Sequence, residues 1–108
     1  MAEEPDKRMK ILLAEGNQEI STLYNITLAP RGHRVTVTNN GEECLQVYHR
    51  ELQNVTLSTN PSDHIQPFDA VILDYKMPKI NGIEDTKEIL AINSHQRIIF
   101  ASAYGMIF

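Results

Sequence analysis

The chain has 108 residues, of which 42% are apolar, so it can form one domain with a hydrophobic core. Its net charge of −4 provides no basic stripe, which argues against direct binding of nucleic acid. No window approaches eighteen uninterrupted apolar residues, and the charged N-terminus precedes no long apolar region. The sequence therefore predicts neither a membrane span nor a signal peptide, and we expect a cytoplasmic protein.

Residues 1–8 are polar and charged and include one proline, so we expect a mobile N-terminal tail. The remaining residues, 9–108, show no internal repeat and no second composition that would mark another domain. The lone Cys44 has no partner for an internal disulfide and lies among apolar residues, which predicts a small packed side chain.

Three elements are predicted before residue 40. The apolar residues 11–14 form a first strand. Asn17 can cap a helix whose apolar residues are spaced three or four apart, and Pro30 with Gly32 ends it. Residues 35–38 alternate valine with threonine and predict a short second strand.

A second helix is predicted from the turn at residues 39–41 to about Gln53. The residues that mark its apolar side are Cys44, Leu45, Tyr48 and Leu52. The segment from Asn54 to Pro67 is polar, carries two prolines and has no clear period. It is longer than most connections in compact domains, so it is either functional or poorly ordered.

The most informative stretch is the apolar run from Phe68 to Asp74, which predicts a third strand covered on both faces. The run ends in the carboxylate of Asp74, at the end of the strand where open α/β sheets bind ligands. Pro78 cannot continue a ladder, and Gly82 permits the turn into a third helix over residues 83–92.

A fourth strand is predicted over residues 98–101. Strands that alternate with helices predict the α/β class, with a parallel sheet and right-handed crossovers. The handedness places the first helix on one face of the sheet and the second and third helices on the other.

Three stretches, which follow one another along the chain as in the family, resemble the receiver domain of two-component response regulators. The strand that ends at Asp74, followed by Met77-Pro78 and a glycine before a helix, resembles the phosphoacceptor segment. Residues 10–20 resemble the first strand and acidic loop, and residues 97–105 resemble the fourth strand with its Ser-Ala pair. The resemblance implies a flavodoxin-like sheet in the order 2-1-3-4. It also implies a further helix, strand and helix, so we expect a receiver truncated after the fourth strand.

The resemblance also implies roles for single residues. Asp74 corresponds to the phosphoacceptor, and a carboxylate there can attack phosphorus when a cation neutralises the incoming charge. Ser102 corresponds to the hydroxyl that contacts the phosphoryl group and helps to couple phosphorylation to conformation. Glu15, Asp74 and the backbone carbonyl of Lys76 correspond to ligands of Mg²⁺. Each residue also has an alternative interpretation without a function. Asp74 is then a solvated acid at the end of a strand, Ser102 a polar residue that closes a strand, and Glu15 a solvated loop acid.

Two positions depart from the family pattern. Gly16 stands where receivers carry a second acid, and Mg²⁺ requires near-octahedral oxygen ligands, so the resemblance implies a weakened magnesium site. The family's lysine at the end of the fifth strand has no counterpart.

Two hypotheses stay open. The chain accepts a phosphoryl group from a histidine kinase or phosphotransfer protein, or it is a pseudo-receiver that binds partners without phosphorylation. The sequence shows neither a nucleophile paired with a base nor a glycine loop that could cradle a phosphate, so it does not predict an independent enzyme.

The predicted topology leaves one face of the third and fourth strands without a helix, although apolar residues alternate onto both faces of these strands. An open apolar face and an unpaired edge strand are an aggregation hazard that a symmetric partner can cover. We therefore expect a homodimer, or a larger oligomer, that buries the region around the fourth strand and the tail at residues 104–108.

Overall fold

The structure is a computed structural model, and it describes residues 8–58, 66–74, 82–102 and 105–107. Of the predicted tail at residues 1–8, residues 1–7 lie outside the described residues. Within the described part of the chain, no helix is long and apolar enough to cross a membrane.

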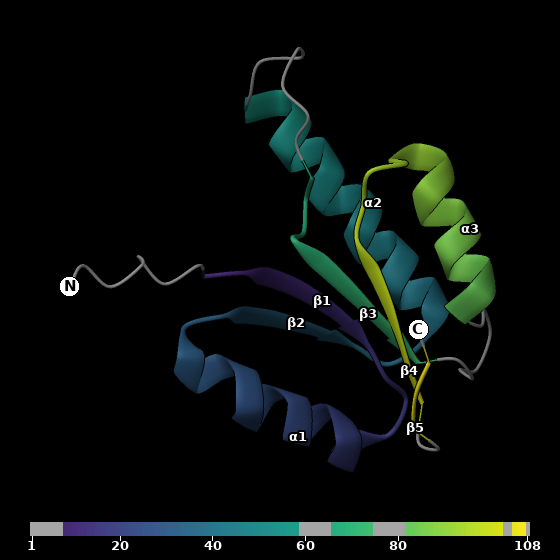
Figure 1. Ribbon diagram of the computed structural model, residues 1–108. Helices are drawn as coiled ribbons and strands as arrows, with labels where there is room; N and C mark the ends of the chain where they lie inside the picture. The colour runs from purple at the N-terminus through teal and green to yellow at the C-terminus, as the bar shows by residue number, and fades with distance from the viewer. Residues whose placement is uncertain (1–7, 59–65, 75–81, 103–104, 108) are drawn as a thin grey trace.

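Four parallel strands form the sheet in the order β2-β1-β3-β4, as predicted (Figure 1). The strands are β1 (Lys10–Ala14), β2 (Arg34–Thr38), β3 (Ala70–Asp74) and β4 (Ile98–Ser102). The predicted bounds differ from these by one or two residues. β1 and β3 occupy the centre, and their apolar side chains are buried on both faces. This is the reason for their continuous apolar sequences.

A fifth strand, β5 (Gly105–Ile107), pairs antiparallel with β4. The sequence predicted four strands and an unpaired edge on the fourth, so this strand was not predicted. Gly105 is the register partner of Ser102, and only two residues separate them in the sequence. An antiparallel neighbour can follow after so short a connection, whereas a parallel one needs a long crossover. The outer edge of the sheet is therefore β5 and not β4.

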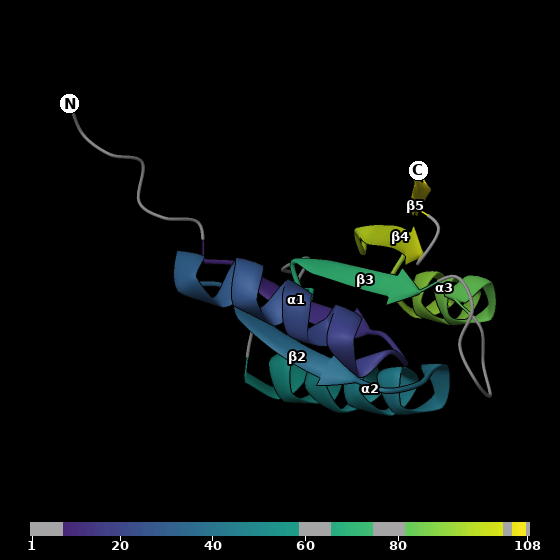
Figure 2. The ribbon, with the colours of Figure 1, turned by 90° about the horizontal axis from the view of Figure 1, so that it is seen from below.

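The helices lie on the predicted faces, with α1 on one side of the sheet and α2 with α3 on the other (Figures 1 and 2). Their bounds are α1 (Gln18–Leu28), α2 (Gly41–Ser58) and α3 (Gly82–Ile92), and a short 3₁₀ helix η1 (Ala29–Arg31) follows α1. Asn17 caps α1 as predicted, because its side chain accepts a hydrogen bond of 3.1 Å from the backbone N–H of Ile20. Gly32 ends η1 with a φ of 88°, a left-handed conformation that suits glycine.

The end of α2 is a correction, because the helix continues to Ser58 where the sequence predicted an end near Gln53. Leu52 and Val55 extend the half-buried side of the helix by another turn. The Thr56 hydroxyl donates a hydrogen bond of 2.7 Å to the Leu52 carbonyl, so this threonine is compatible with a helical backbone. Residues 59–65 of the predicted connection lie outside the described residues.

The core has one cluster on each face of the sheet. The larger cluster, under α2 and α3, contains Leu12, Ala14, Cys44, Val47, Tyr48, Phe68, Val71, Leu73 and Ile89. The smaller one, under α1, contains Ile11, Leu13 and Ile72, with five partly buried apolar residues around them. The α1 face therefore buries less apolar surface, and it contributes less of the hydrophobic free energy of folding.

A buried polar residue ties the larger cluster together. Gln96 is 4% exposed, and its Oε1 accepts a hydrogen bond of 2.9 Å from the Tyr48 hydroxyl of α2. Its Nε2 donates to the carbonyl oxygens of Phe68 and Arg97, at 2.9 and 3.1 Å. One side chain thus joins α2 to the segments that enter β3 and β4.

We predict that Gln96→Ala lowers the free energy of unfolding by about 2–3 kcal/mol, because it removes the acceptor of the buried Tyr48 hydroxyl and a donor to the buried Phe68 carbonyl. Gln46→Ala, at an exposed position of α2, serves as the control and should change it by less than about 0.5 kcal/mol. Urea unfolding of the three proteins measures both values. Equal stability of the two variants would show that the Gln96 bonds contribute nothing net.

Candidate functional site

Two carboxyl groups meet at the carboxyl end of the sheet. Asp74 ends β3, and Glu15 directly follows β1, the strand beside it. Ala14 is the register partner of Leu73, so the next residue on each strand also stands side by side. Side chains alternate along a strand, and both acids fall on the face that carries α1. The predicted pairing of these two strand ends is therefore present.

Glu15 is 4% exposed, so it is not a solvated loop acid. Its Oε2 accepts a hydrogen bond of 3.0 Å from the backbone N–H of Asn17. Burial raises the pKa of the Glu15 carboxyl, and the Asn17 hydrogen bond partly lowers it. The charge of Asp74 and a hydrogen bond to its side chain raise this pKa further. The two carboxyl groups thus lie close enough to share a proton.

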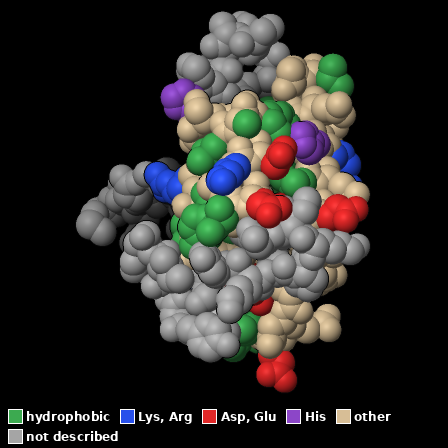
Figure 3. Space-filling view, turned by 90° about the vertical axis from the view of Figure 1, so that its right-hand side faces the viewer, with side chains coloured by type: hydrophobic (Ala, Val, Ile, Leu, Met, Phe, Trp, Pro, Cys, Tyr) green, Lys and Arg blue, Asp and Glu red, His purple; other side chains and the backbone are tan. Residues whose placement is uncertain are grey.

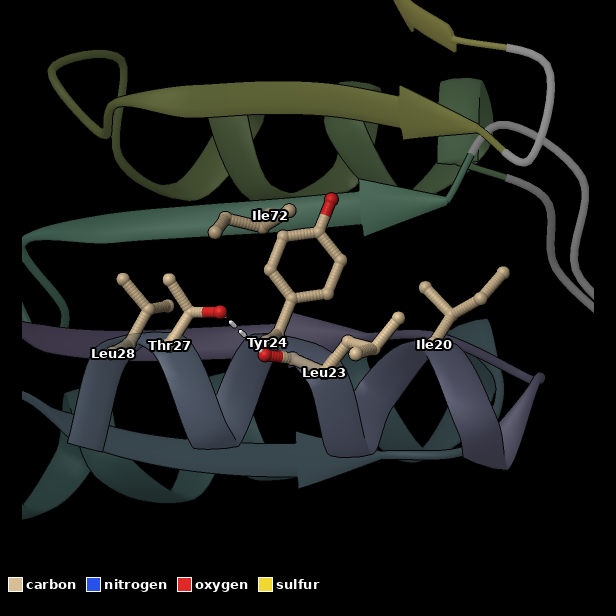
Figure 4. A pocket seen from close by; sticks show the side chains of 6 residues that line it. All are labelled: Ile20, Leu23, Tyr24, Thr27, Leu28 and Ile72. Carbon is tan, nitrogen blue, oxygen red and sulfur yellow. Dashed lines mark hydrogen bonds between the residues drawn. The ribbon is translucent and has the colours of Figure 1, made fainter. Parts of the chain in front are cut away.

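Tyr24 of α1 is a neighbour of this pair, and it is one of the regularly spaced apolar residues of the predicted first helix, for which no role at the site was predicted. Its ring extends from α1 beside Ile72 of β3, and its hydroxyl points away from the helix (Figure 4). Burial raises the pKa of the Tyr24 hydroxyl, and the charges of Glu15 and Asp74 raise it further. The phenol therefore lies within electrostatic range of both acids. A tyrosine nearly two turns into a helix that follows an acidic loop is the signal that could have indicated this.

The other predicted site residues are placed less completely. Ala101 is the register partner of Asp74, so Ser102 lies one residue beyond it at the same end of the sheet. Lys76 lies outside the described residues. Among the described residues, this end of the sheet included, no group of three or more His, Cys, Asp or Glu side chains could hold a metal ion. Glu15 and Asp74 have the oxygen donors that Mg²⁺ prefers, so the chemistry of the pair fits this ion. Two acids provide fewer side-chain ligands than a set of three would.

An apolar groove lies between α1 and β3 on the same face as the acid pair (Figure 4). Its volume is about 420 Å³, and it is lined by Ile20, Leu23, Tyr24, Thr27, Leu28 and Ile72. Leu23 is 62% exposed. This groove corresponds to the face that the predicted topology leaves without a helix.

Comparison with known proteins gives a consistent family. A family described as the response regulator receiver domain matches residues 11–108. The CpxR homolog, a transcriptional regulatory protein of Haemophilus influenzae, is 32% identical over 79% of this chain and 30% of its own length. Sporulation initiation phosphotransferase F of Bacillus subtilis is 29% identical over 89% of this chain and 65% of its own length. The chain thus spans only part of the curated relatives that it matches.

Solved structures agree with this match. The response regulator TrrA of Thermotoga maritima, solved with Mg²⁺ and a beryllium fluoride, is 30% identical, with a TM-score of 0.67 over 88% of this chain and 70% of that protein. TrrA has also been solved in complex with the histidine kinase ThkA. The receiver domain of the histidine kinase CKI1 of Arabidopsis thaliana shares the fold, with a TM-score of 0.74 and 24% identity over 87% of this chain and 65% of that protein.

We predict that Asp74→Asn raises the free energy of unfolding by about 0.5–2 kcal/mol at neutral pH, because it removes a charge beside buried Glu15. The folded pKa of Glu15 is raised, so Glu15 destabilises the fold increasingly as pH rises above its usual pKa. The gain from Asp74→Asn should therefore shrink at acid pH.

The matched comparison is a double-mutant cycle with Glu15→Gln, followed by urea unfolding at both pH values. In the Glu15→Gln background the gain from Asp74→Asn should largely vanish. An undiminished gain would show that the two carboxyl groups do not interact.

Proposed function

The chain belongs to the receiver domain family of two-component systems, and from this premise we propose that Asp74 accepts a phosphoryl group from a histidine kinase or phosphotransfer protein. The observation that carries the proposal is the position of Asp74. It ends a central strand, is partly exposed and lies against a second carboxyl group. The exposure lets a donor reach it. The partner class follows the complex of TrrA with ThkA.

In the proposed step, a carboxylate oxygen of Asp74 forms a bond to phosphorus while the bond from phosphorus to the donor breaks. The nucleophile must be ionised. Without a cation, burial raises the pKa of Glu15 and favours its neutral form, and a bound Mg²⁺ would displace that proton. Ser102, at the same end of the sheet, is the proposed contact for the phosphoryl group.

Glu15, Asp74 and the Lys76 backbone carbonyl would hold Mg²⁺, which neutralises phosphoryl oxygens when it is bound. Gly16 contributes no ligand, so we propose weak binding of this ion. The same feature supports the second candidate, a pseudo-receiver that binds partners without phosphorylation. In both cases the domain is a signalling module and not an enzyme, and we propose a cytoplasmic location, where kinases draw on ATP.

We expect slow, magnesium-dependent phosphoryl uptake at Asp74, measured as intact mass after incubation with a small phosphodonor. Asp74→Asn should abolish it, because an amide does not replace the carboxylate. Gly16→Asp should strengthen Mg²⁺ binding by adding a ligand. Asp69→Asn is the control, since this exposed acid lies just before β3, at the opposite end of the strand from Asp74.

The outcomes separate the two candidates. Uptake that survives in Asp74→Asn excludes this residue as the acceptor. Absence of uptake in the unmodified chain and in Gly16→Asp, with Mg²⁺ present, supports the pseudo-receiver. Efficient uptake by the unmodified chain would show that Gly16 is no handicap.

We further propose that the chain forms a homodimer through the open α1 face and the region of β4 and β5. Ile72 and Ile99 are register partners on that face, and the described residues place no helix other than α1 over it. The groove beside them is apolar. A second copy covers this surface and meets the edge strand at the same time. Of the tail at residues 104–108, the proposed interface includes the backbone of residues 105–107, which form β5.

Sedimentation at micromolar concentration should show a dimer, and Leu23→Lys should shift it to monomer, because a charge at the groove carries a desolvation cost when the face is covered. Leu57→Lys is the matched control. Leu57 is 86% exposed on α2, which packs on the other face of the sheet. A monomer in all three proteins refutes the dimer, and a dimer that tolerates Leu23→Lys moves the interface away from α1.

A further inference from the structure

The helix α3 carries a carboxylic acid on its inner side. Asp85 is 0% exposed and lies one turn before the core residue Ile89, whereas Glu84 and Glu88 are exposed. Acidic side chains are visible at the surface on the side of the molecule that carries α3 (Figure 3). Neither carboxyl oxygen of Asp85 has a hydrogen-bond partner. A buried polar group in this state opposes folding, and its ionised form opposes it far more.

The surroundings of Asp85 offer no compensating charge within the described part of the chain. From α2, the Cys44 thiol lies within electrostatic range of Asp85, and Glu43 acts on the same thiol. On α3 itself the nearby charged groups are Glu84 and Glu88. The strands beneath contribute apolar side chains and Thr38, whose hydroxyl donates to the Leu13 carbonyl instead.

We propose that Asp85 makes the packing of α3 against α2 and the sheet depend on pH in the neutral range. The neutral acid is tolerated at this interface, and the ionised form loosens the first turn of α3. Burial raises the pKa of Asp85 to about 7, and the charges of Glu84 and Glu88 act in the same direction. The positive end of the α3 dipole favours the ionised form, but this effect is weak beside full burial.

The direction of the pH dependence follows from the two states. The unfolded carboxyl ionises near its ordinary pKa of 3.8, and the folded one near 7. Between these values the folded chain binds more protons, so rising pH weakens folding by up to about tenfold in equilibrium constant per pH unit. Above the folded pKa the loss is complete and constant. α3 is the first described element after Asp74, so the loosened turn lies next to the segment that continues from the candidate site.

Two measurements test the proposal, and neither depends on phosphorylation. A carbon-detected NMR titration of the unmodified chain should show the Asp85 carboxyl changing with a midpoint near 7. Backbone amides of α2 and α3 near Asp85 should shift with the same midpoint. A midpoint near 4 would overturn the proposal, because it would mean that the carboxyl is solvated or paired.

Urea unfolding over the same pH range gives the second measurement. Asp85→Asn keeps the shape and removes the titration, so stability should fall less from pH 5 to pH 8 than in the unmodified chain, and the variant should be the more stable one at pH 8. Glu19→Gln, an exposed acid in the first turn of α1, is the control and should leave the pH dependence unchanged. Equal pH dependence in the unmodified chain and Asp85→Asn would refute the inference. If Asp85→Asn does not fold, the NMR midpoint of the unmodified chain decides.

Discussion

The pairing of β1 with β3 is the constraint on which the rest of the structure depends. These two strands fill the centre of the sheet, and their register brings Glu15 and Asp74 side by side where both strands end. The same pairing separates the core into two clusters, because alternate side chains of both strands point to opposite faces. A slip of one residue would turn Asp74 into the apolar interface and a leucine toward the candidate site. Packing and chemistry therefore select the same register.

The two buried acids of the described chain show how the surroundings decide what a carboxyl group does. Glu15 lies at the rim of the sheet, where a backbone N–H and a second carboxyl group give it hydrogen-bond partners. Asp85 lies between α3 and the core, and its oxygens have no partner. Burial raises both pKa values. The partnered acid can exchange a proton with a neighbour, whereas the unpartnered one can respond only by changing its own charge.

The two faces of the sheet differ in how completely they are covered. Under α2 and α3 the cluster includes the aromatic pair Tyr48 and Phe68, with ring centroids 6.2 Å apart, and Gln96 connects three segments there. Under α1 the cluster is smaller and opens into the groove at Leu23 and Ile72. Tyr24 belongs to both the groove and the surroundings of the acid pair. Whatever covers the groove therefore lies close to the residues that carry the proposed chemistry.

Much of this protein was determined by local patterns in its sequence. The apolar runs before Glu15 and Asp74, the Asn17 cap and the alternation of strands with helices predicted a parallel sheet and the faces of the helices, because these features depend on periodicity and handedness. The order of the strands was predicted by the resemblance to receiver domains. The end of α2 and the strand β5 were not predicted. The end of α2 was missed because helix propensity is weak at Asn54 and Thr56. The strand β5 was missed because its three residues form a strand only by pairing with β4. The burial of Asp85, the hydrogen bond between Glu15 and Asp74 and the approach of Tyr24 to both acids were decided by tertiary structure alone. Each depends on which side chains meet across separate elements, and an exposed acid and a buried one are the same letter in a sequence.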